Sequence, residues 1–245
     1  MIASTPVQSA AREPSLSRTR AGLELIVFFG FAIGSKLVAD QVIWKFAGPI
    51  TLILTLVLLT LYMRTRGERW SSMGLRAVPG WKSKLLILPQ ALLAIVAILA
   101  SGNLVVFGGD ALGLWTAMEE PAGVADRFGG IEGNLTVYLT WMLVVWTSAA
   151  FGEEMFFRGF MLTRLRSVVS GIPFATALAV ILAGIIFGGV HLYYQGLRGF
   201  VTVAAIGIAL GSLFFLYKKN LWPLILAHGL VDTLGMTARY LDLDV

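Results

Sequence analysis

Residues 135–157 have the sequence LTVYLTWMLVVWTSAAFGEEMFF, an almost unbroken apolar run with two adjacent glutamates near its end. A helix of about 20 apolar residues is long enough to cross the hydrocarbon core of a bilayer. Charged side chains inside such a span are costly, and they usually face a protein interior or a water-filled cavity. This run therefore predicts a membrane-spanning helix that carries a polar site on one face.

The rest of the chain is similarly apolar. Hydrophobic residues make up 57% of the 245 positions and charged residues 13%, against about 25% charged in soluble domains. The runs lack the alternation of a β-barrel, so helices are expected. The predicted fold class is all-α, a polytopic integral membrane bundle of seven to eight transmembrane helices, the eighth depending on residues 159–169 or the loop near Trp115. Besides 135–157, the predicted spans are 23–38, 47–63, 85–107, 173–190, 200–217 and 221–237.

Charge patterning predicts the domain organisation and the orientation. Residues 1–20 are polar and rich in Ser and Arg, so they are expected to form a disordered cytoplasmic tail, while residues 21–245 form a single transmembrane domain. The net charge is +5, with cations gathered in connecting segments such as 64–84. By the positive-inside rule these segments and the N-terminus are cytoplasmic, and the acidic loop 110–132 is extracytoplasmic. The excess of basic residues thus reflects the orientation of the protein in the membrane, and no nucleic-acid partner is predicted from it.

Helical geometry separates the two glutamates. Glu154 and Arg158 are four residues apart, share a helix face and are expected to form an internal ion pair. Glu153 points about 100° away, along a flank that includes the small residues Ala149 and Ala150 and the rings of Phe156 and Phe157. The small residues leave room for water or substrate, so Glu153 is the predicted general base. The alternative is that all three charges form only a structural network at the inner membrane interface.

The chain has two histidines and no cysteine, which excludes disulfides, thiolate metal sites and cysteine proteases. Phe187 precedes His191 by four residues and can cover the imidazole ring. His228 and Asp232 are also one turn apart, so the carboxylate can orient the ring. A catalytic arrangement follows, in which Glu153 and His191 activate a water and His228 donates to the oxyanion. A packing role for a histidine is the alternative.

Three patterns, Glu-Glu-x-x-x-Arg, Phe-x-x-x-His and His-x-x-x-Asn/Asp, follow one another on apolar segments. In this order they resemble the CPBP intramembrane proteases, the CAAX proteases and bacteriocin-processing enzymes also called the Abi family. The resemblance covers about residues 69–238, with the catalytic core at 135–238. It implies that Glu153 activates water with His191, that His228 and Asp232 stabilise the oxyanion, and that Glu154 and Arg158 support them. The CAAX endopeptidases have asparagine at position 232, and a carboxylate cannot donate a hydrogen bond.

The predicted protein is an intramembrane endopeptidase of the bacterial plasma membrane, acting on peptides, lipidated substrates or membrane-anchored proteins. No cofactor is expected. A zinc mechanism ranks second because His and carboxylate can bind zinc, although no HExxH motif occurs. Two alternatives stay open: a non-catalytic membrane scaffold or immunity protein of the same family, and a proton-coupled transporter. The sequence makes no prediction of the oligomeric state.

Overall fold

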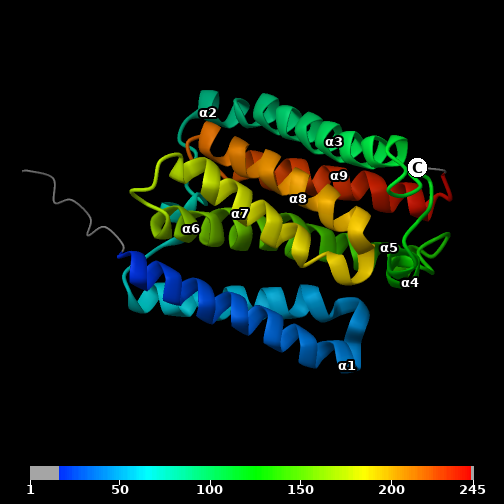
Figure 1. The fold of residues 1–245 in the computed structure, drawn as a ribbon, viewed down its shortest axis with the longest axis horizontal. Helices are drawn as coiled ribbons and strands as arrows, with labels where there is room; N and C mark the ends of the chain where they lie inside the picture. Colours follow the sequence, from blue (N-terminus) through cyan, green and yellow to red (C-terminus); the bar gives the residue numbers. More distant parts are fainter. Residues whose placement is uncertain (1–16, 244–245) are drawn as a thin grey trace, which may run out of the picture.

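The computed structural model describes residues 17–243, and every regular element within them is a helix. The chain begins with α1 (Arg18–Thr65), which consists of two arms because Ile43 leaves the helical conformation (φ −134°, ψ 44°). The arms fold back on each other as a hairpin (Figure 1) and contain the predicted spans 23–38 and 47–63. Residues 18–20, predicted as part of a disordered tail, are helical because Ser17 caps the helix. The rest of the predicted tail, residues 1–16, and residues 244–245 lie outside the described residues.

The other elements follow the remaining predicted spans. Residues 135–168 form one continuous rod made of α5, η2 and α6, and α8 contains a break at Gly196 (φ 64°). The elements after α1 are η1 (Trp70–Met73), α2 (Trp81–Leu85), α3 (Ile87–Ala111), α4 (Ala122–Phe128), α5 (Leu135–Val144), η2 (Val145–Met161), α6 (Leu162–Val168), α7 (Ala175–Gly189), α8 (Leu192–Leu216) and α9 (Trp222–Tyr240).

This arrangement confirms an all-α membrane bundle. Within residues 17–243, four helical segments are long and apolar enough to cross a bilayer: α1, residues 81–111, residues 135–168 and α8. Counting the two arms of α1 separately and adding α7 and α9 gives seven rods. Neither predicted eighth span forms among the described residues. Residues 159–169 prolong the α5–η2 rod, and the loop near Trp115 folds back so that the indole Nε1 donates to the carbonyl of Val106 (2.9 Å).

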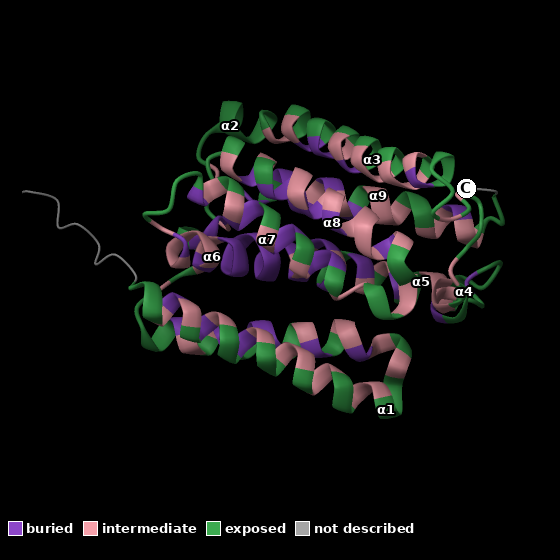
Figure 2. Ribbon diagram, viewed as in Figure 1, coloured by how far each residue is buried: buried purple, intermediate pink, exposed green. Residues whose placement is uncertain are grey.

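The rod that carries the glutamates lies inside the bundle. Figure 2 shows buried residues concentrated on η2, α7, α8 and α9, whereas α1 and α3 are largely exposed on their outer faces. Phe156 and Phe160 of η2 are almost completely buried. The outer faces carry large apolar side chains, including Val42 on α1 and Leu104 on α3, which are 84% and 75% exposed. Such faces are suited to contact with lipid, so the site on η2 is shielded from the bilayer by its neighbours.

Glycines allow α7 and α8 to approach closely, as the small-xxx-small spacing predicts. A Cβ atom on Gly184 would lie 2.5 Å from Cγ1 of Ile208, and one on Gly188 would lie 2.4 Å from the carbonyl oxygen of Phe200. Gly189, in contrast, has open space around it. The close packing therefore holds the end of α7, and His191 just beyond it, against the first half of α8.

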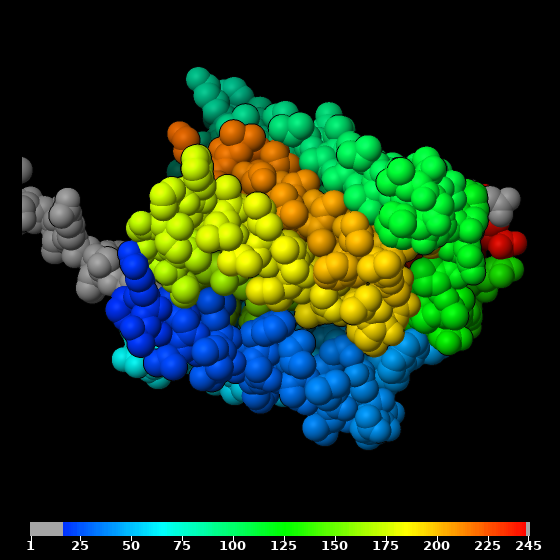
Figure 3. All heavy atoms as spheres, in the orientation of Figure 1, coloured from blue at the N-terminus to red at the C-terminus, as the bar shows by residue number. Residues whose placement is uncertain are grey.

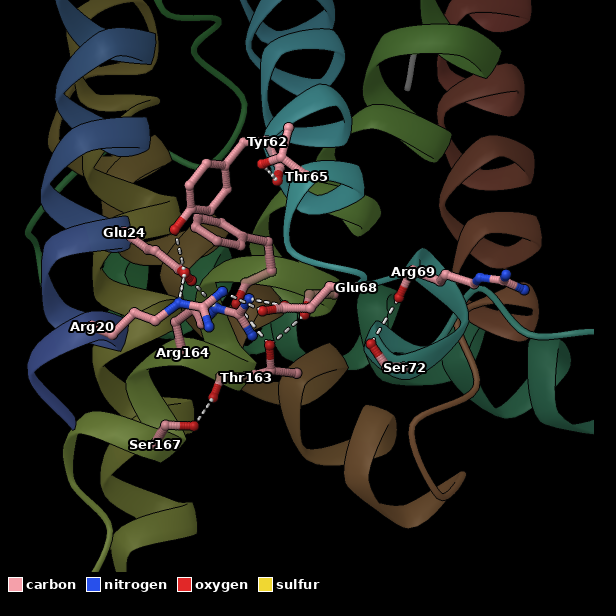
Figure 4. A network of polar contacts seen from close by, with 12 residues as sticks. Arg20, Glu24, Tyr62, Thr65, Glu68, Arg69, Ser72, Thr163, Arg164 and Ser167 are labelled. Atoms are coloured by element: carbon pink, nitrogen blue, oxygen red, sulfur yellow. Dashed lines mark hydrogen bonds and ion pairs between the residues drawn. The ribbon is translucent and has the colours of Figure 1, made fainter. Parts of the chain in front are cut away.

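A buried charge network fastens the α1 hairpin to the bundle (Figure 4). Glu24, only 4% exposed, accepts hydrogen bonds from Arg20 (2.7 Å), Tyr62 (2.8 Å) and Arg164 (2.6 Å). Glu68 accepts from Arg20 and Arg164, both at 2.5 Å. Both arms of α1, the segment after it and α6 thus meet in one network. Because the pairs are partly or fully buried, they are less screened than surface salt bridges.

The ends of the bundle differ in charge. The start of α1, α2 and α6 lie at one end, and α4 and the C-terminus lie at the other (Figure 1). The basic segments predicted to be cytoplasmic therefore share an end, and the acidic loop that contains α4 lies opposite. Helix α7 runs away from the basic end and brings His191 to the far end.

Candidate active site

The segment with the glutamates is a π-helix, Val145–Met161, instead of the α-helix that the sequence predicts. In a π-helix the hydrogen bonds join residues five apart, and such turns occur frequently at functional sites. The widened helix still separates the two glutamates. Glu153 lines a cavity together with Ala149, Phe156 and Phe157, whereas Glu154 is fully buried and absent from the cavity wall. Ala150, predicted on the same flank, is buried away from the cavity.

The cavity has a volume of about 480 Å³ and lies among η2, α1, α4, α9 and the α7–α8 junction. On the face drawn in Figure 3, α1 (blue) borders the α7–α8 region (yellow to orange), and both contribute wall residues. The walls are mainly apolar. The four predicted catalytic residues lie on the wall, Glu153, His191, His228 and Asp232, together with the supporting Phe187. The fold thus brings together side chains from three helical segments of the sequence.

Glu154 joins two of these segments beneath the cavity. Its Oε1 lies 3.0 Å from Nη1 of Arg158, the ion pair that the spacing predicts, and 2.9 Å from Nδ1 of His228. The Arg158 guanidinium also lies over the ring of Phe187, 4.2 Å from its centroid. Glu154 and Arg158 are 0% and 3% exposed. The link from Glu154 to His228 ties η2 to α9 and was not apparent from the sequence.

His228 stands between two carboxylates. Its Nδ1 makes the hydrogen bond with Glu154, and because a carboxylate accepts, Nδ1 carries the proton. Its Nε2 lies 3.6 Å from Oδ2 of Asp232 on the same helix. The side chains of His228 and Asp232 are 14% and 31% exposed, so this edge of the imidazole faces the cavity. The arrangement holds the ring with Nε2 available to a bound molecule.

His191 is fixed by the helix that precedes it. Its Nδ1 lies 2.8 Å from the carbonyl oxygen of Phe187, which can only accept, so Nδ1 donates. In the neutral ring Nε2 is then an acceptor. The Phe187 ring packs edge-on against the imidazole at 4.9 Å, as the spacing predicts, and the Tyr194 ring lies 5.9 Å away. His191 therefore presents a hydrogen-bond acceptor at the cavity.

Several polar wall residues were not predicted. Arg127, the one cation of the acidic loop 110–132, lines the cavity from α4. Its isolation among acidic residues was the only feature of the sequence that could have marked Arg127 as a functional residue. The other polar residues missed on the wall are Lys36, Thr51, Ser148, Tyr193, Tyr194, Gln195 and Arg239.

The His and carboxylate side chains around the cavity are of types that can bind zinc. A catalytic zinc ion needs about three protein side chains directed at one point. Within residues 17–243 no group of three or more His, Asp or Glu side chains is arranged to hold a metal ion. Nδ1 of His228 is already hydrogen-bonded to Glu154. The side chains in this conformation therefore do not form a ready-made zinc site.

Residues 135–234 match a family model described as Type II CAAX prenyl endopeptidase Rce1-like. The matched segment runs from the start of α5 into α9 and contains Glu153, His191, His228 and Asp232. It agrees with the resemblance to the CPBP proteases, over a shorter range than residues 69–238. The comparisons with curated proteins and with solved structures give no match.

Proposed function

We propose that this chain is an intramembrane endopeptidase in which Glu153 activates the attacking water, and the match of residues 135–234 to the Rce1-like type II CAAX prenyl endopeptidase model supports this. The observation that carries the proposal is the shared cavity: Glu153, His191 and His228 come from separate helical segments and line one space inside the bundle. General bases and oxyanion donors must converge on one substrate bond, and a common cavity allows this.

The attack on the peptide bond is assigned to Glu153 and His191. The carboxylate of Glu153 takes a proton from the water as its oxygen adds to the scissile carbonyl carbon. Nε2 of His191, left as an acceptor by the bond from Nδ1 to Phe187, accepts a hydrogen bond from the same water and orients it. The protonated Glu153 then transfers the proton to the leaving amine as the C–N bond breaks. General acid–base catalysis of this kind contributes about 10²–10⁴ in rate.

The developing oxyanion is assigned to His228. In the imidazolium form of His228, Nδ1–H donates to Glu154 and Nε2–H donates into the cavity. Asp232, 3.6 Å from Nε2, positions the ring from the other side. Glu154 and Arg158 act indirectly, because the buried pair fixes the orientation of His228 relative to η2. A carboxylate bonded to one ring nitrogen sets the orientation of a histidine and the role of its other nitrogen.

The cavity walls indicate the kind of substrate. They are mainly apolar and derive partly from both arms of α1, which is exposed on its outer face. An apolar pocket with a few polar groups is suited to an apolar peptide segment or a lipidated chain end. The proposed partners are therefore peptides or membrane-anchored proteins presented by the bilayer.

A cleavage assay tests the proposed function. The purified protein in lipid, incubated with a peptide pool that includes C-terminally prenylated members, is expected to cleave at least one peptide, and a chelator is expected to leave the rate unchanged. Mass spectrometry of the products gives the cleaved bond. Loss of cleavage on chelation with rescue by zinc would overturn the glutamate mechanism, and the absence of any cleavage would contradict the endopeptidase function.

The proposed location is a bacterial plasma membrane with the N-terminus in the cytoplasm. Because the chain has no cysteine, single cysteines can report the orientation. Arg66 follows the end of α1 at the basic end of the bundle. Met118 lies in the acidic loop at the far end and is 81% exposed. The two variants are Arg66→Cys and Met118→Cys. A membrane-impermeant maleimide is expected to label Met118→Cys in intact cells and Arg66→Cys only after lysis. The reverse pattern would show the opposite orientation.

A further inference from the structure

Arg127 is a buried cation on the cavity wall. It lies on α4, is 7% exposed and lines the cavity. Its Nη1 donates to the hydroxyl of Tyr193 at 2.5 Å, while its buried Nε has no hydrogen-bond partner among the described residues. Among the ion pairs formed within residues 17–243, none includes Arg127. The guanidinium therefore lacks a counter-charge.

The other buried arginines differ in this respect. Arg158 pairs with Glu154, and Arg164 pairs with both Glu24 and Glu68. A buried charge without a partner is strongly unfavourable, because desolvation is not offset by attraction. Arg127 is thus the exception among the buried arginines of the described chain, and it is the one that lines the cavity.

Aromatic rings hold the guanidinium without neutralising it. Its Cζ lies 4.8 Å from the ring centroid of Tyr194, 5.8 Å from that of Trp141 and 5.9 Å from that of Phe128. Cation–π contacts of this kind are attractive but leave the charge in place. The Arg127 side chain also lines the cavity. The guanidinium is therefore restrained, positively charged and placed on the cavity wall.

Arg127 is also close to the proposed reacting groups. The Tyr194 ring lies 4.8 Å from the guanidinium and 5.9 Å from the His191 ring, so the guanidinium is within about 11 Å of that ring. An extended peptide advances by about 3.3–3.6 Å per residue. An anionic group bound by Arg127 would then lie within about three residues of the cleaved bond.

We infer that Arg127 is a specificity residue that binds a carboxylate of the peptide substrate near the cleaved bond. The carboxylate is either the C-terminal group or an Asp or Glu side chain, and both would make charge-assisted, bidentate hydrogen bonds with a guanidinium. The inference rests on the proposed endopeptidase function for the identity of the ligand, but the binding itself is measurable without catalysis.

The experiment measures peptide affinity in the full-length Glu153→Gln protein, so that no probe is consumed. The probes are dye-labelled apolar hexapeptides with a free C-terminal carboxylate, with a C-terminal amide, or with the amide and one internal aspartate. The free carboxylate or the aspartate peptide is expected to bind about tenfold to a hundredfold more tightly than the plain amide. The better of the two identifies the source of the carboxylate. Equal affinity for all three, or no binding of any, would overturn the inference.

Substitution then assigns the effect to Arg127. Arg127→Gln should remove the preference, Arg127→Lys should keep part of it, and Arg198→Gln should leave it unchanged, because Arg198 lies at the same end but not on the cavity wall. Since Arg127 has no carboxylate partner, Arg127→Gln should unfold at no lower a temperature than the parent protein. A retained preference in folded Arg127→Gln would contradict the inference.

The two proposals can fail separately. Cleavage by the wild-type protein without a carboxylate preference in binding would refute the role of Arg127 and leave the endopeptidase function intact. A carboxylate preference that depends on Arg127, in a protein that cleaves no peptide, would support the binding role of Arg127 and refute the endopeptidase function.

Discussion

Replacement of Glu153 by glutamine is expected to lower kcat for peptide cleavage by about 10³-fold, within the range for loss of a general base. Glutamine has nearly the same shape but cannot take a proton from water at neutral pH. Because Glu153 lines the cavity and makes no ion pair within residues 17–243, its replacement should leave the fold intact. Single-turnover cleavage of an identified peptide, together with the unfolding temperature, measures both effects.

A matched control separates this effect from a general loss of charge. Glu132 is exposed in the loop before α5, and Glu132→Gln is expected to keep the wild-type rate. If Glu153→Gln retained wild-type activity, the protease mechanism proposed for this residue would be wrong. Full activity of Glu153→Gln in cells, in a protein that cleaves no peptide, would instead favour the non-catalytic scaffold.

The second large effect is expected on stability. Arg158→Met should lower the free energy of unfolding by about 3 kcal/mol, because it leaves Glu154 buried without its arginine partner. The Arg158 side chain is 3% exposed and that of Glu154 0%, so water cannot replace the lost contact. Denaturant titration in micelles measures the change. The loss of the contact with the Phe187 ring acts in the same direction.

Three further variants test whether the ion pair causes this loss: Arg64→Met, Glu154→Gln, and the double variant Glu154→Gln with Arg158→Met. Arg64→Met removes an exposed arginine at the basic end and is expected to change the unfolding free energy by less than about 0.5 kcal/mol. The double variant Glu154→Gln with Arg158→Met removes both charges and should be less destabilised than the sum of the single variants. Additive effects would contradict a stabilising interaction between Glu154 and Arg158, whose charged atoms lie 3.0 Å apart.

Much of the fold could be predicted from the sequence, because a bilayer imposes a simple requirement on each span. Each membrane helix needs about 20 apolar residues and must satisfy its own backbone hydrogen bonds. The predicted spans therefore agree with the helices of the structure, including the two arms of α1. The two arms are joined without a loop, because Ile43 alone leaves the helical conformation between them.

Local contacts of the site were predictable for a related reason. Residues four apart on a helix lie on one face, so the pairs Glu154–Arg158, Phe187–His191 and His228–Asp232 follow from spacing alone. The structure contains all three contacts. Each depends only on the conformation of one helical segment and not on how the segments pack.

The sequence by itself thus determined that the chain is a helical membrane protein, where its spans lie and which neighbours share a helix face. Only the tertiary structure decided that Glu154 reaches His228 across 74 positions, that η2 widens into a π-helix, and that Arg127 lines the cavity. These features depend on the crossing of helices and the volumes of facing side chains. Contacts of that kind have no sequence period, because the packing of several distant segments sets them together.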